Sequence, residues 1–188
     1  MAARSLFVVL AALLLPAPAQ AERVTAEVAF HGELIHFSLD ARVRAPADAV
    51  IAMLHDYEDL ANVFPLVQSA ERRGSPRARV ERVETHMRGC VLFVCQTLRH
   101  TLDIEHEGSG RFRGITVPDQ SQARFGHFLW RIDQQASDPP LTRIRLDGRF
   151  QPELRIPPLI GRPLVRHMLE HELQDSIRRI EDHLGAAP

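Results

Sequence analysis

The C-terminal segment carries the pattern that most restricts how this chain can fold. Its apolar residues recur at spacings of three and four over more than five helical turns, which is typical of a helix with one apolar face. They are Val165, Met168, Leu169, Leu173, Ile177, Ile180 and Leu184. Gly185 follows the last of them and is a common helix stop signal. A helix of this length buries its apolar face only if the rest of the chain supplies a large apolar surface.

The preceding segments supply that surface as strands. We expect strands at about 24–30, 35–44, 66–73, 78–89, 95–106, 111–117, 123–136 and 141–152. Clusters of turn-forming residues lie between several of them, at 74–76, 107–110 and 138–140. Two strands alternate cleanly, with Leu98, His100, Leu102, Ile104 and His106 on one face of the first, and Ile144, Leu146, Gly148 and Phe150 on one face of the second. The pattern predicts an antiparallel sheet with one wet face and one covered face.

Two short helices are expected between the second and third strands. Pro46 suits the first turn of a helix over about 46–56, and a second helix over 57–63 stops at Phe64-Pro65. The fold class is therefore α+β, with the long C-terminal helix laid across one curved sheet. A straight helix cannot touch a curved sheet everywhere, so a gap between them is expected, and a ligand would lie there.

The N-terminus predicts export. Arg4 precedes an apolar run over 5–15, and Ala19-Gln20-Ala21 places small residues where a signal peptidase reads the chain. The run is too short to span a bilayer, which needs roughly 20 apolar residues. We expect residues 1–21 to be a signal peptide, residues 22–188 to form a single ligand-binding domain, and the protein to be periplasmic or secreted.

Composition removes several function classes. The formal net charge is −1, so no strong field attracts nucleic acid, and no nucleic-acid partner is expected. Every basic residue is Arg, which excludes a Schiff-base lysine, a P-loop lysine and a lysine general base. The glycine-rich turn of dinucleotide sites and the nucleophile elbow of serine hydrolases do not occur in the sequence. We therefore expect no cofactor and assign no catalytic residue.

One stretch has the spacing of a metal site. His167, Glu170 and His171 match the H-x-x-E-H pattern of inverted zincins, and two His four residues apart share a helical face. A catalytic zinc needs a third protein ligand, and only 17 residues follow His171. We predict no metal at this stretch.

The two cysteines, Cys90 and Cys95, are too far apart in an extended strand to bond, so a bond requires the chain to turn back. Because exported proteins meet an oxidising environment, we predict a disulfide at a hairpin tip. Between them lie Val91, Leu92, Phe93 and Val94, four apolar residues where a hairpin loop is usually polar. Either this tip folds inward or the strand runs straight through it, or else the tip is exposed and makes transient contact with a membrane or a partner.

The chain resembles the START-like superfamily, which includes coenzyme-Q-binding proteins, polyketide cyclases and plant pathogenesis-related lipid binders. The resemblance rests on VRAPADAV at 43–50, LHDYEDL at 54–60 and Phe64-Pro65, and it covers about residues 33–184. Phe128, Leu129 and Trp130 resemble the aromatic strand of the coenzyme-Q-binding branch. The resemblance implies a helix-grip fold, in which about seven antiparallel strands wrap round the C-terminal helix and enclose a cavity.

A fold of this kind implies noncatalytic binding or transfer of a hydrophobic small molecule, such as a lipid or an isoprenoid quinone. The alternative is a cyclase- or hydratase-like enzyme that uses His100 or His106 as acid or base. The covered faces of the strands and the helix stripe predict the residues that line the pocket. These are Leu98, His100, Leu102, Phe128, Trp130, Phe150, Met168 and Leu173. His100 would be a polar anchor for the ligand, or else a core histidine with its hydrogen bonds satisfied.

Overall fold

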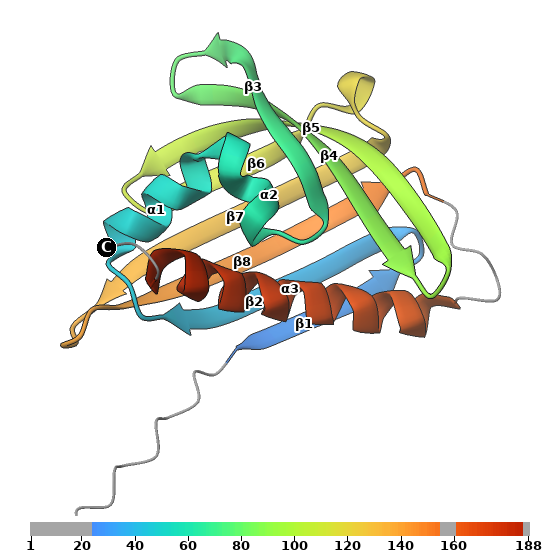
Figure 1. The fold of residues 1–188 in the computed structure, drawn as a ribbon. Helices are drawn as coiled ribbons and strands as arrows, with labels where there is room; N and C mark the ends of the chain where they lie inside the picture. Colours follow the sequence, from blue (N-terminus) through green and yellow to red (C-terminus); the bar gives the residue numbers. More distant parts are fainter. Residues whose placement is uncertain (1–23, 155–160, 186–188) are drawn as a thin grey trace, which may run out of the picture.

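The computed structural model describes residues 24–154 and 161–185, so the expected signal peptide lies outside the described residues. One antiparallel sheet of eight strands has the order β1-β2-β8-β7-β6-β5-β4-β3 (Figure 1). The strands are β1 Thr25–His31, β2 Leu34–Val43, β3 Val67–Arg77, β4 Val80–Val91, β5 Val94–Gly108, β6 Arg111–Thr116, β7 Ala123–Gln135 and β8 Leu141–Pro152. The helices are α1 Ala47–His55, η1 Tyr57–Asp59, α2 Leu60–Val63, η2 Pro118–Gln120 and α3 Gly161–Gly185. Within the described ranges, no helix is both long and apolar enough to cross a bilayer.

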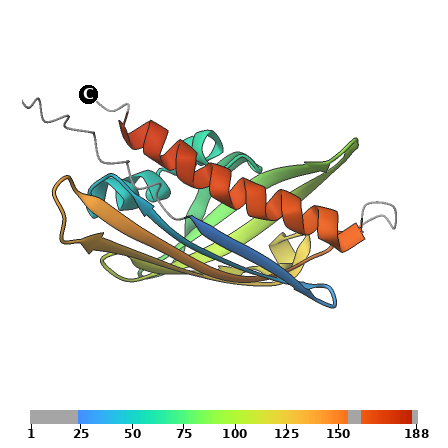
Figure 2. The same cartoon turned by 90° about the horizontal axis from the view of Figure 1, so that it is seen from below.

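The long helix α3 crosses the concave face of the sheet, and α1 and α2 cover the same face beside it (Figures 1 and 2). The helix-grip fold is therefore confirmed, with eight strands rather than about seven. β2 pairs with β8 over nearly its whole length, which joins the first and last parts of the sheet. The edge strand β1 is tied to α3 because the backbone N–H of Val28 donates to Glu170 Oε1 at 3.2 Å.

The packed core occupies one end of the molecule. It brings together β2, α1, the middle of β8 and the second half of α3. Its most buried members include Val43, Val50, Ile144, Ile177 and Ile180, each no more than 1% exposed. Branched aliphatic side chains of this kind interdigitate closely, so this end of α3 is fixed to the sheet by dense apolar contact.

The expected turn at 74–76 was wrong. Residues Gly74, Ser75 and Pro76 lie inside β3, and the chain reverses later, at Arg79, which has a φ of 61°. The ladder between β3 and β4 shifts register on both sides of Gly74, whose φ of 116° is readily adopted only by glycine. A bulge and a proline are tolerated here because β3 is an edge strand, where one side of the backbone needs no strand partner.

Candidate functional site: a cavity under the C-terminal helix

A cavity of about 390 Å³ lies between the sheet and α3. Its lining is almost entirely apolar and aromatic, and its size falls within the range of small-molecule sites. All eight residues that the sequence placed in a pocket line this one cavity. The structure therefore brings together side chains from β5, β7, β8 and α3, as the alternation of the strands and the periodicity of the helix predict.

His100 is the most buried polar group on the sheet side of the cavity among the described residues, and only 3% of it is exposed. Aromatic rings surround it: its ring centroid lies 4.9 Å from that of Phe150 and 5.7 Å from that of Phe128. Nε2 of His100 and Oγ1 of Thr116 form a hydrogen bond of 2.7 Å. Burial lowers the pKa of His100 to about 4, so the ring is neutral at ordinary pH and offers a ligand hydrogen bonding without charge.

The hydrogen bond of His100 depends on a glycine in the neighbouring strand. A Cβ on Gly126 would lie only 2.1 Å from the Thr116 hydroxyl oxygen, so a larger residue would displace Thr116. Gly148 similarly leaves room for the ring of Phe37, which a Cβ there would meet at 2.3 Å. The aromatic side of the cavity is therefore shaped by two close approaches that strand alternation does not predict.

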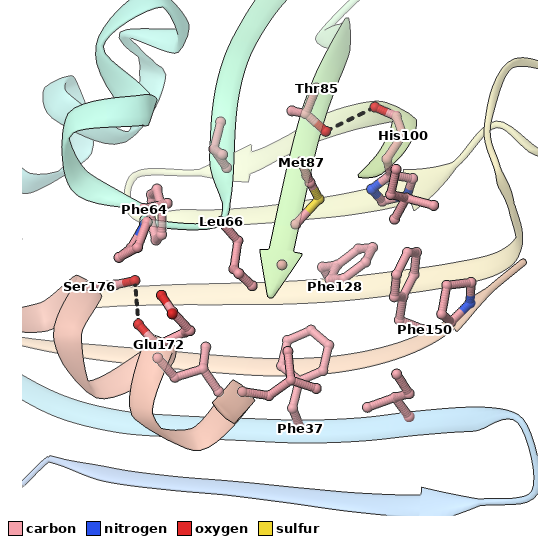
Figure 3. Close-up of a pocket in the computed structure, with 18 of the residues that line it drawn as sticks. Phe37, Phe64, Leu66, Thr85, Met87, His100, Phe128, Phe150, Glu172 and Ser176 are labelled. Carbon is pink, nitrogen blue, oxygen red and sulfur yellow. Dashed lines mark hydrogen bonds between the residues drawn. The ribbon is translucent and has the colours of Figure 1, made fainter. Parts of the chain in front are cut away.

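Glu172 is a polar cavity residue that the sequence analysis missed. It faces the cavity from α3, across from His100 (Figure 3). Its Oε2 atom is buried and has no hydrogen-bond partner among the described residues. Burial raises the pKa of this carboxyl, and the nearby charge of Asp175 raises it further. Glu172 follows Met168 by four residues and Leu169 by three, so the helical period would have placed it on the same face.

The connection between α1 and β3 also lines the cavity, and no periodic pattern marked it. Tyr57, Leu60 and Phe64 project into the cavity from η1, α2 and the residue that ends α2. Elements of three or four residues are too short to show an apolar period, which explains why these side chains escaped prediction. Phe37 of β2 and Met87 of β4 also line the cavity.

His106, the other candidate acid or base, is not among the residues that line the cavity. Its ring meets that of His55 at 4.8 Å, and its Nε2 lies 3.5 Å from Glu81 Oε2. The Tyr57 hydroxyl donates to the same carboxylate at 2.7 Å. Burial alone would raise the pKa of Glu81, but the hydrogen bond from Tyr57 and the charge of Arg72 outweigh burial and lower it.

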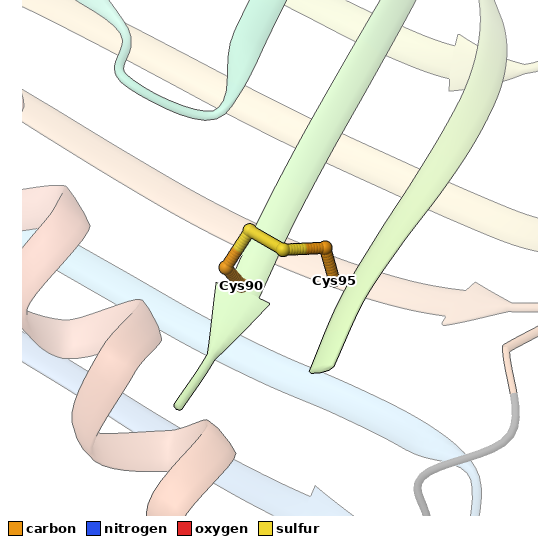
Figure 4. The surroundings of a disulfide bond; sticks show 2 residues. All are labelled: Cys90 and Cys95. Atoms are coloured by element: carbon orange, nitrogen blue, oxygen red, sulfur yellow. A yellow bond between two sulfur atoms is a disulfide. The ribbon is translucent and has the colours of Figure 1, made fainter. Parts of the chain in front are cut away.

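The four apolar residues at the tip of the β4–β5 hairpin point in two different directions. Val91 and Val94 line the cavity, whereas Leu92 and Phe93 are 73% and 88% exposed. A strand that runs straight through this stretch is wrong, because Val91 pairs with Val94 across a turn. The expectations of an inward and of an exposed tip are each met by one pair of residues. Cys90 and Cys95 face each other in the ladder and are joined by a disulfide, as the sequence predicted (Figure 4).

The H-x-x-E-H stretch lies on the outer part of α3. His167 and His171 are exposed, and Glu170 accepts the hydrogen bond from β1 described above. Among residues 24–154 and 161–185, no cluster of three His, Cys, Asp or Glu side chains has the geometry of a metal site.

Comparisons with known proteins agree with this architecture. A family model described as polyketide cyclase/dehydrase and lipid transport matches residues 35–185, which begins at β2 and leaves out β1. No curated protein matches the chain in sequence. Three similar solved structures are a START superfamily protein from Mycobacterium smegmatis, the Zhui aromatase/cyclase from a Streptomyces species, and a STAR-related lipid transfer protein from Xanthomonas axonopodis.

The similarity to these structures is one of fold. The mycobacterial protein is 13% identical with a TM-score of 0.62, and the match covers 80% of this chain and 97% of that one. The cyclase is 16% identical with a TM-score of 0.60, covering 81% and 94%. The Xanthomonas protein is 15% identical with a TM-score of 0.64, covering 87% and 98%.

Proposed function

Because this chain belongs to the polyketide cyclase/dehydrase and lipid transport family, we propose that it binds or transfers a hydrophobic small molecule without altering it. The observation that carries the proposal is the apolar cavity of about 390 Å³ under α3. A lipid tail of about 16 methylenes loses roughly 13 kcal/mol of burial on entering water. A protein that offers the tail an apolar cavity removes most of this barrier to movement between membranes.

The polar groups of the cavity suggest the shape of the ligand. His100 and Glu172 lie on opposite walls, and the surface between them is apolar and aromatic. An amphipathic molecule with a hydrogen-bonding head and an apolar tail suits this distribution. A lipid satisfies it, and so does an isoprenoid quinone, the ligand of the branch that Phe128, Leu129 and Trp130 resemble.

We place the carrier outside the cytoplasm, in the periplasm or the extracellular medium. The export pattern over 1–21 supports this, and the Cys90–Cys95 disulfide fits an oxidising compartment. N-terminal sequencing of protein recovered from its own host should find a mature chain that begins at Glu22. Retention of Met1 on the exported protein would contradict this placement.

The ligand itself is the main test. Protein purified from its own host should yield a stoichiometric hydrophobic molecule in an organic extract analysed by mass spectrometry. Leu102→Trp adds a large side chain to the cavity wall and should reduce the extracted molecule at least fivefold. Thr97→Trp is the matched control, because Thr97 is exposed on the other face of the same strand. No bound molecule in the wild type, or equal amounts in both variants, would refute the carrier function.

The second candidate function is acid–base catalysis on a molecule held in the same cavity, as in a cyclase. It is favoured by two titratable groups of the cavity lining, His100 with a lowered pKa and Glu172 with a raised one. The variants His100→Gln and Glu172→Gln separate the two functions. A carrier yields the same extracted molecule from all three proteins, whereas an enzyme accumulates a chemically different precursor in the variants.

A further inference from the structure

The turn between β4 and β5 has residue types that are unusual in hairpin turns. Leu92 is the first of its two central residues and has a φ of 55°, a left-handed conformation in which glycine or asparagine is normally found. Leu92 and Phe93 are also the two most exposed large apolar residues among those described. A sequence that keeps two apolar side chains at such a position accepts both backbone strain and exposed apolar surface. Departures of this kind are expected at functional sites.

The hairpin holds these side chains firmly in place. Val91 faces Val94 in the pair next to the turn, and the Cys90–Cys95 disulfide joins the two strands at the following pair. The hairpin also rests on the first half of α3, because a Cβ on Gly89 would lie 3.6 Å from the terminal methyl carbon of Met168. Leu92 and Phe93 therefore project from a hairpin that is held by a disulfide and by its contact with α3.

The surroundings of the tip are basic and adjoin the cavity. Val91 and Val94, on either side of the exposed pair, both line the cavity. Arg88 lies in the hairpin, and Arg162 and Arg166 lie in the first turns of α3; all three are exposed. No Asp or Glu occurs between residues 86 and 102 or between 161 and 169. The β4–β5 hairpin and the first turns of α3 thus carry exposed arginines and no carboxylates.

We propose that this tip inserts Leu92 and Phe93 into the interfacial layer of an anionic lipid bilayer while the neighbouring arginines contact lipid phosphates. Two side chains are a small area for a protein interface, which typically buries about 800 Å² on each partner. In a bilayer each inserted apolar side chain contributes separately, and basic residues add attraction to anionic lipids. The inference goes beyond carriage of a ligand by naming the surface where the protein docks, and it does not require the cavity to be occupied.

Co-sedimentation with vesicles of phosphatidylethanolamine and phosphatidylglycerol tests the proposal. The wild type should bind these vesicles, bind less tightly as salt is raised, and bind pure phosphatidylcholine vesicles at least tenfold more weakly. The double variant Leu92→Gly/Phe93→Ser should lose at least tenfold in affinity. Glycine relieves the left-handed conformation at position 92, so this variant should melt at the wild-type temperature or above it.

Phe125→Ser is the matched control. Phe125 is 42% exposed and lies on the convex face of the sheet, away from the cavity, so its loss should leave vesicle binding unchanged.

Phe93→Trp places a reporter at the tip, and brominated lipids should quench its fluorescence while the emission of Trp130 in the wild type is unaffected. Absence of wild-type binding, or undiminished binding by the double variant, would overturn the proposal.

The outcomes separate this proposal from carriage of a ligand. A wild type that binds vesicles but yields no extracted molecule retains the docking surface and loses the carrier function. A wild type that yields a bound molecule but does not bind vesicles supports the carrier function and overturns the docking surface.

Discussion

The two halves of α3 have the same apolar period but meet different surroundings. In the second half, Ile177 and Ile180 are 1% and 0% exposed and interdigitate with branched residues of β2, β8 and α1. In the first half and at the midpoint, Met168 and Leu173 line the cavity and are only half-buried, although Leu173 also packs against the edge of the core. The difference shows that an apolar stripe specifies which face of a helix is covered. Whether that face becomes core or cavity wall depends on the spacing and size of the residues opposite.

The largest expected effect comes from truncating α3 in each half. Ile180→Ala should cost about 2–5 kcal/mol of unfolding free energy, because a close-packed site leaves a hole when it loses three carbons. Leu173→Ala should cost less than half as much, since Leu173 already borders a cavity. Urea denaturation monitored by circular dichroism measures both. Equal costs would show that the two halves are packed alike.

Acid should lower the free energy of unfolding through His100, in the half of the molecule that contains the cavity. Its pKa is about 4 in the folded protein and near 6.5 in the unfolded chain, so the unfolded state takes up the proton first as pH falls. The neutral form therefore contributes stability that is full above about pH 6.5 and is lost as pH falls toward 4, amounting to something on the order of 3 kcal/mol.

Comparison with His100→Gln isolates this contribution. Glutamine keeps a hydrogen bond within reach of Thr116 but does not titrate in this range. The difference in unfolding free energy between the two proteins should therefore shift in favour of the variant between pH 6.5 and 4. A difference that is constant with pH would show that His100 is not buried in its neutral form.

The sequence predicted the arrangement of the strands and α3 because each of those elements is long enough to repeat its apolar period several times. Leu98, His100 and Leu102 were correctly placed on one covered face by alternation alone. Features of the cavity that depend on one close contact between two residues leave no repeating pattern in the sequence. Gly126 beside Thr116 is one example. The carboxyl of Glu172 escaped for a different reason, since it lies on the apolar face but was excluded by its charge.

The disulfide should stabilise the half of the molecule that contains the cavity more than the half that contains the packed core. Cys90→Ser/Cys95→Ser should lower the free energy of unfolding by roughly 2 kcal/mol, the value that the chain-entropy model gives for a short loop. Hydrogen exchange should show the loss as faster exchange of amides in β4 and β5, with the paired amides of β2 and β8 changing less. Uniformly faster exchange would mean that the two halves open together.

The smallest effect on stability is expected where a large residue enters the cavity. Leu102→Trp should cost less than about 1 kcal/mol, because overpacking is costly only where neighbouring atoms leave no room. Ile144→Trp, in the packed half, should cost about 1–3 kcal/mol or more, or prevent folding. Thermal melts of the two variants give the comparison directly, and a Leu102→Trp protein as unstable as Ile144→Trp would remove the distinction between the halves.

The pairing of β2 with β8 also has a consequence for the order in which the molecule assembles. The Thr142 hydroxyl donates to the carbonyl of Ala45 at 2.6 Å, although the two residues are 97 positions apart in the chain. Each of the six strands β3 to β8 pairs with the strand next to it in the sequence, whereas β2 must wait for β8, and the buried isoleucines of α3 come later still. Closing so long a loop is entropically slow. We therefore expect the nascent chain to form a meander of adjacent hairpins first, and to acquire its binding cavity only when the last helix docks.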